Sequence, residues 1–100
     1  MKSIMQDDIS RCYLCGRNGA VDPLEWHHVF GGPNRRISDR DGLLVRLCGD
    51  RCHRNGKHAV HRCKATAERL KAEGQRAWME KTGGSVEAFR ARYGKNYLEV

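Results

Sequence analysis

Four cysteines in two short pairs constrain the fold of this chain more than any other feature. The first pair is Cys12-x2-Cys15 and the second is Cys48-x3-Cys52, with 32 residues between them. Zinc takes four ligands in a tetrahedron, and thiolate pairs on two tight turns supply them without strain in the long connection. We therefore predict a structural zinc site in which Cys12, Cys15, Cys48 and Cys52 fill all four positions.

The composition shows why such a site is needed. Only 18 of the 100 residues are leucine, isoleucine, valine or phenylalanine, and the formal net charge is +7. A short chain with so few core-forming side chains needs a disulfide, a metal or a partner in order to fold. All ten cysteines and histidines lie between residues 12 and 63, so the metal-type residues occupy only part of the chain.

The redox state of the cysteines follows from their number and from the N-terminal residues. The cysteine count of five is odd, and residues 1–10 have no apolar stretch of the kind found in secretion signals. We therefore expect reduced thiols and a cytoplasmic protein, with no membrane span. The fifth cysteine, Cys63, is expected to be an apolar helix residue, or to replace Cys52 if the three-residue spacing fits badly.

The remaining patterns predict an α+β fold. Residues 24–30 and 43–47 are rich in apolar and aromatic side chains and are predicted to be strands, separated by a polar loop over residues 35–42. A helix is predicted from about residue 60 to residue 82, and a short helix follows Ser85 and ends before Gly94. We expect a flexible N-terminal arm (1–10) and one domain (11–100), with a core of about residues 11–70 and a helical tail of about residues 71–100.

The histidines predict a second metal site. His27 and His28 are neighbours on the first predicted strand, so their side chains point to opposite faces. This geometry favours one metal ligand and one free base over two ligands of a single ion. His53 directly follows the second cysteine pair, and His58 and His61 come shortly after it.

The order of these motifs resembles that of a known family. Cys-x-x-Cys, then Trp-His-His-Val-Phe-Gly-Gly (26–32), then Leu-Cys-x-x-x-Cys-His (47–53) is similar to the HNH endonucleases with their ββα-metal core. The continuation through residues 56–61 and the end of the chain resembles a small phage and prophage branch, which is similar in its core to the recombination-enhancement nucleases. The resemblance covers roughly residues 11–98. It implies a ββα-metal core that is stabilised by a structural zinc and carries a C-terminal helical extension.

The resemblance also implies roles for individual residues. His28 would be the general base, and His27 and His53 would bind the catalytic metal. The third ligand would be His61, with His58 as the alternate. The asparagine that orients the base in the family is missing ahead of the second cysteine pair. Either Asn34, the only asparagine between the two motifs, or a backbone carbonyl would orient His28 instead.

These residue types suit phosphodiester hydrolysis. A histidine with a pKa near 6.5 is a competent base at neutral pH, and a divalent cation neutralises the charge that develops on the phosphate. Imidazole ligands favour zinc or nickel over magnesium, with manganese bound less strongly, and the identity of the ion (Mg²⁺, Mn²⁺, Ni²⁺ or Zn²⁺) stays open. Arg35, Arg36 and Arg40 lie in the predicted loop, where they would hold flanking phosphates.

The sequence therefore predicts a metal-dependent endonuclease that cleaves DNA, most simply double-stranded DNA, in a bacterial or phage-infected cell. Low sequence specificity is expected, because one small domain has little surface for base readout. The alternative is a catalytically weak or inactive zinc module that binds nucleic acid or a protein partner. The choice between DNA and RNA, and between nicking and double-strand cleavage, stays open.

Overall fold

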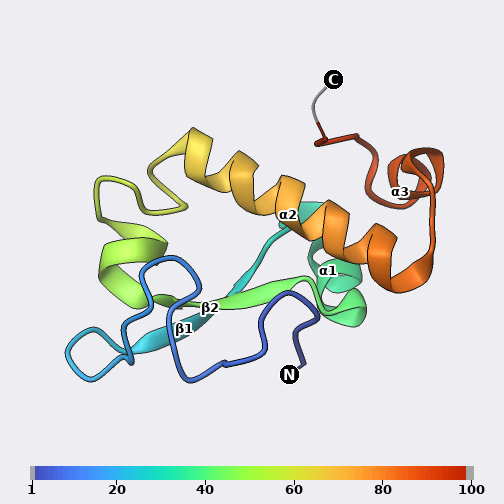
Figure 1. Cartoon of the computed structure of the whole chain (residues 1–100). Coiled ribbons are helices and arrows are strands. Elements are labelled where there is room, and N and C mark those ends of the chain that lie inside the picture. Colours follow the sequence, from blue (N-terminus) through green and yellow to red (C-terminus); the bar gives the residue numbers. More distant parts are fainter. Residues whose placement is uncertain (1, 99–100) are drawn as a thin grey trace.

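The computed structural model describes residues 2–98, which form a small α+β fold around a two-stranded antiparallel sheet. The elements in chain order are β1 (Leu24–His28), η1 (Gly32–Asn34), α1 (Arg35–Asp41), β2 (Leu44–Cys48), η2 (Gly49–Arg54), α2 (Lys64–Thr82) and α3 (Val86–Tyr93). Figure 1 shows the long helix α2 crossing above the β1–β2 hairpin, with α3 near its C-terminal end. The α+β class expected from the sequence is confirmed.

The two strands are paired so that the histidines lie at the end of the sheet. Leu24 pairs with Cys48, and His28 pairs with Leu44. Because side chains alternate across a strand, His27 and His28 point to different faces. We expected strands over residues 24–30 and 43–47. β1 ends two residues earlier than predicted, and β2 begins and ends one residue later.

The polar segment between the strands is a helix, which corrects the predicted loop. The α1 segment ends at Gly42, whose φ of 76° supplies the left-handed turn that closes the helix. Its only buried residue is Ser38, whose hydroxyl donates to the carbonyl of Leu43 at 2.6 Å and accepts from the amide of Phe30 at 3.2 Å. These tertiary bonds stabilise a polar helix that has no apolar face of its own.

The second cysteine pair is likewise more regular than predicted. Residues Gly49–Arg54 form a short π-helical segment, η2, directly after β2. The chain then follows an irregular path until α2 begins at Lys64, later than the predicted start near residue 60. Two backbone bonds guide this path, from Val60 to Cys52 at 2.8 Å and from His61 to His53 at 3.1 Å.

Both C-terminal helices end as the sequence predicts. Gly83 and Gly94 follow α2 and α3 in the left-handed conformation, and the hydroxyl of Ser85 caps α3 by accepting from the amide of Ala88 at 3.1 Å.

An ion pair joins α3 to α1. The carboxylate of Asp41 accepts two hydrogen bonds from Arg92, at 2.6 and 2.7 Å.

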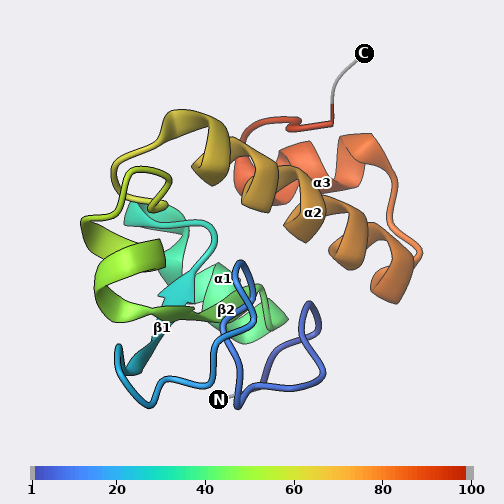
Figure 2. The same ribbon diagram turned by 60° about the vertical axis from the view of Figure 1, so that its left-hand side comes forward.

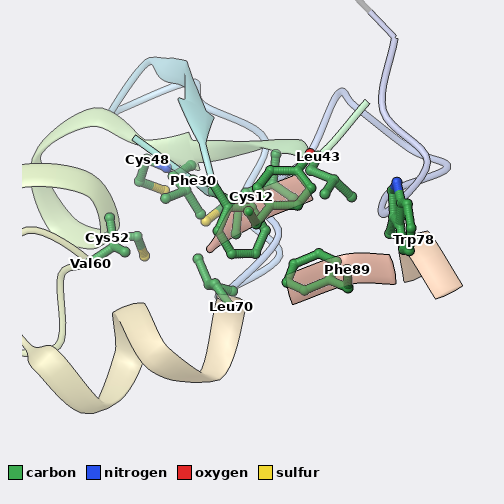
Figure 3. Close-up of a cluster of buried hydrophobic side chains, with 13 residues drawn as sticks. Cys12, Phe30, Leu43, Cys48, Cys52, Val60, Leu70, Trp78 and Phe89 are labelled. Carbon is green, nitrogen blue, oxygen red and sulfur yellow. The ribbon is translucent and has the colours of Figure 1, made fainter. Parts of the chain in front are cut away.

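The apolar core lies where α2 and α3 meet the hairpin. Phe30 contacts Phe89, Tyr93 and Tyr97, with ring centroids 4.6–5.6 Å apart. Figure 3 shows Leu70 of α2 pointing into the same region as Phe30. Phe89, Tyr93 and Tyr97, which follow one another at intervals of four residues, thus form a packing surface for the core.

Residues 4–6, part of the segment that we expected to be a flexible arm, lie against the rest of the fold. The amide of Ile4 donates to the carbonyl of Gly42 at 2.9 Å, and the side chain of Gln6 accepts from the amide of Arg46 at 2.9 Å. Ile4 and Met5 pack against the core. Within residues 2–98, no helix combines the length and the apolar character that crossing a membrane requires.

Candidate metal and catalytic site

The four predicted cysteines come together at one end of the hairpin. Cys12 and Cys15 lie on a turn that Gly16 completes with a φ of 81°, whereas Cys48 ends β2 and Cys52 lies in η2. The four sulfur atoms lie within 4.8 Å of one another, and all but Cys15 are buried. A closed set of four thiols at this spacing fits a structural metal such as zinc.

The ionisation of these thiols supports the fit to a cation. Burial opposes ionisation of Cys15, but hydrogen bonds from the backbone and side chain of Arg17 outweigh it and lower its pKa to about 6. Burial and the neighbouring sulfur atoms raise the pKa of Cys48 to about 12 and also raise the pKa of Cys52. The protein alone therefore resists placing several thiolates together, and a divalent cation would supply the missing charge.

Cys63 lies outside this cluster. It is the N-cap residue of α2 and is only partly buried. Hydrogen bonds from Thr66, and then from His58, lower the pKa of its thiol to about 7. It does not take the place of Cys52.

Three histidines form a second cluster, which we call the three-histidine cluster: His27, His53 and His61. Their ring nitrogens lie within 4.8 Å of one another, and the ring centroids are 4.7–5.3 Å apart. They come from β1, from η2 and from the segment before α2. The cysteine cluster helps to position them, because His53 directly follows Cys52 in the chain.

Two of these histidines are biased toward the neutral form. Burial, followed by the charges of His53 and His61, lowers the pKa of His27 to about 3. Lys71 contributes to the same shift. Burial also lowers the pKa of His61. Neutral imidazole is the form that binds metal, so these two side chains are ready ligands at neutral pH.

Glu25 holds the third histidine in place. Nδ1 of His53 lies 2.7 Å from the Glu25 carboxylate, which also accepts a bond from Arg54. The bonds from Arg54 and His53 lower the pKa of Glu25 to about 2, so it is an acceptor only. Nδ1 must therefore carry the proton, which leaves the lone pair on Nε2. Carboxylates commonly fix metal-binding histidines in this way.

His28 has a different partner from the three-histidine cluster. Its Nε2 lies 3.1 Å from Oδ1 of Asp39, and its side chain is only 10% exposed. A carboxylate can only accept, so Nε2 donates and Nδ1 keeps its lone pair. The contact with Asp39 thus fixes the ring and leaves Nδ1 able to accept a proton.

A groove connects the two kinds of histidine. One hollow of about 250 Å³ is lined by Trp26, Gly31 and the three-histidine cluster. Another, of about 490 Å³, is lined by Gly32, Pro33, Arg36 and Asp39. Both hollows also include His28 and Arg35, so we treat them as one groove that runs past the candidate base.

The other predicted site residues lie elsewhere. His58 lines a separate hollow beside Cys15 and Lys57 and is not part of the three-histidine cluster. Arg40 faces a hollow near Lys2, unlike Arg35 and Arg36.

Asn34 does not contact His28. Its amide donates to the carbonyl of Tyr93 at 3.0 Å. The partner of His28 is instead Asp39, which was missed because we expected a loop there. Glu25 was also missed, although its position two residues before His27 places it on the same face of β1.

Comparisons with protein-family models, curated proteins and solved structures found no match for this chain.

Proposed function

We propose that this protein is a metal-dependent endonuclease of the HNH type that hydrolyses phosphodiester bonds in DNA. The observation that carries the proposal is the position of His28. Its ring is bonded to Asp39 and lies in the same groove as the three-histidine cluster. A base next to a candidate cation site is the minimum that this hydrolysis needs.

His27, His53 and His61 would hold the catalytic cation, and the antiparallel hairpin that carries His27 would be the ββ part of a ββα-metal core. When bound, a divalent cation at this site supplies positive charge for the oxygens of the scissile phosphate. Three nitrogen ligands favour zinc, nickel or cobalt over magnesium, with manganese weaker than these. The cysteine cluster would hold a separate structural zinc.

In this mechanism, Nδ1 of His28 accepts a proton from the attacking water. Asp39 would stabilise the resulting imidazolium through the bond at Nε2, which leaves Nδ1 as the accepting nitrogen. Arg35 and Arg36 line the groove and would hold the phosphates on either side of the cleaved bond. Double-stranded DNA is the proposed substrate, and the small surface around the groove favours low sequence specificity.

The proposal is tested by incubating the zinc-loaded protein with supercoiled plasmid and with single-stranded DNA or RNA of the same sequence. Each reaction receives magnesium, manganese, nickel, cobalt or a chelator that spares the cysteine-bound zinc. We expect metal-dependent conversion of supercoiled plasmid to nicked or linear DNA. If the folded, zinc-loaded protein cleaves nothing with any ion, the alternative of an inactive nucleic-acid or protein-binding module replaces the proposal.

A further inference from the structure

A buried glutamine fastens the residues after α3 onto α2. The side chain of Gln75 has no exposed surface, yet both of its polar atoms are bonded. Its Nε2 donates to Oδ1 of Asn96 at 2.8 Å, and its Oε1 accepts from the amide of Tyr97 at 2.7 Å. Because buried polar groups are costly without partners, this pairing fixes the segment on the helix.

The fixed segment brings two lysines to one aromatic ring. The ammonium of Lys95 lies 5.2 Å from the centroid of the Tyr97 ring, and that of Lys71, from α2, lies 5.6 Å from it. The same ring also packs against the core, since its centroid lies 5.4 Å from that of Phe30. Two positive charges are therefore held near each other by a ring that cannot move freely.

Neither lysine is paired with an acidic side chain in the part of the chain that the structure describes. Among residues 2–98, the ion pairs with acidic side chains use arginines and histidines, and neither lysine is in one. Glu68, on α2, is the acidic side chain whose charge acts on Tyr97. It forms no ion pair with either lysine in this part of the chain.

Lys71 lies on the side of α2 that faces the hairpin. The helix comes closest to the hairpin at Gly74, where a Cβ atom would lie 3.2 Å from Phe30 and 3.4 Å from Val29. Val29 lies two residues after His27, so α2 packs on the side of the strand that carries His27. Lys71 lies one helical turn before Gly74 on the same face of α2, and its charge acts on His27. Figure 2 shows α2 above the hairpin, with the chain after α3 running back along it.

We propose that Lys71 and Lys95, held around Tyr97, form a second phosphate-contact surface for nucleic acid on the α2 side of the groove. The inference rests on the proposed nucleic-acid substrate and extends its footprint. A strand that passes His28 would touch Arg35 and Arg36 in the groove and then continue onto α2. The helical tail thereby becomes part of the substrate-binding surface in addition to its role in the core.

The test is duplex DNA binding by zinc-loaded protein that carries His28→Ala, so that no substrate is cut. The double variant Lys71→Gln/Lys95→Gln is compared with Lys2→Gln/Lys81→Gln, which removes the same charge from exposed lysines elsewhere. Each is titrated with a labelled duplex between about 50 and 200 mM salt. The slope of log affinity against log salt is negative, at about −0.9 per phosphate contact, so losing two contacts should make it less steep by about 1.8 in the first variant only.

The inference would be overturned if Lys71→Gln/Lys95→Gln and Lys2→Gln/Lys81→Gln showed equal slopes, whether both slopes became less steep or both kept the parent value. Absence of any duplex binding by the parent protein would overturn it as well. Arg35→Gln/Arg36→Gln separates this inference from the proposed function. If the salt dependence of duplex affinity becomes less steep in that variant but not in the Lys71/Lys95 variant, the groove still binds nucleic acid. In that case only the proposed contact surface on α2 is ruled out.

Discussion

Nε2 of His28 lies 3.1 Å from Oδ1 of Asp39, which joins the end of β1 to a helix formed almost entirely of polar residues. The pairing determines which nitrogen of His28 is free. It also explains how a base can be oriented here although the stretch before the second cysteine pair contains no asparagine.

Replacing Asp39 should slow cleavage while leaving the fold intact. A hydrogen bond to a charged group contributes about 1.5–3 kcal/mol, and the Asp39 side chain is 51% exposed, so we expect the lower end. Asp39→Ala should therefore lower the rate of plasmid cleavage about tenfold. Asp39→Asn keeps an acceptor and should retain more activity. An unchanged cleavage rate in Asp39→Ala would remove this residue from the mechanism.

The cysteine cluster should be required for folding, because a metal held there adds its binding energy to the folded state. We expect Cys12→Ser/Cys48→Ser to lose zinc and helical circular dichroism. Cys63→Ser is the matched control, since Cys63 lies outside the cluster, and should bind as much zinc as the parent protein. The measurement is zinc release by a colorimetric chelator together with the far-ultraviolet spectrum. A folded, zinc-free double variant would refute the structural role.

Glu25 should tune metal binding at the three-histidine cluster. Its carboxylate accepts from Nδ1 of His53 and so directs the other nitrogen toward the cluster. Partners of this kind commonly affect metal affinity by about 10–100-fold. Glu25→Gln should weaken cobalt or nickel binding on this scale in calorimetric titration of the zinc-loaded protein. Glu68→Gln, on the exposed surface of α2, is the control and should bind as the parent does.

The buried histidine predicts how stability depends on pH when the three-histidine cluster holds no metal. The pKa of His27 is about 3 in the folded chain and near 6.5 when unfolded, so the unfolded state binds more protons between these values. Stability should therefore fall as the pH drops below about 6.5, by about 1.4 kcal/mol between pH 7.5 and 5.5 for one such group. Urea unfolding of zinc-loaded protein at the two pH values measures the difference. His27→Asn should show a smaller fall, and an equal fall would assign the effect to other groups.

The parts of the fold that were predictable have strong local signals. Ser85 and Gly94 mark the ends of α3, and the apolar residues of the two strands identify the hairpin. The cysteine spacing predicted the cluster, since two short chelating pairs have few other uses. The adjacent histidines on a strand also predicted that His27 and His28 would lie in different surroundings.

The missed features depend on tertiary contacts. Helix α1 has no apolar periodicity, and what stabilises it is the pair of bonds through buried Ser38 to Phe30 and Leu43. Because α1 was expected to be a loop, the contact between Asp39 and His28 could not be predicted from the sequence. The choice of His61 over His58 also depends on the backbone bond from His61 to His53, which spacing alone does not reveal.

The most direct test of the central claim compares plasmid cleavage by wild type, His28→Ala and His58→Ala under the ion that supports most activity. His58 is the matched control, because it is a histidine outside both the groove and the three-histidine cluster. We expect His28→Ala to lose about 10²-fold or more in rate while it keeps its fold and metal, with His58→Ala close to wild type. Full cleavage by His28→Ala would contradict its role as the general base.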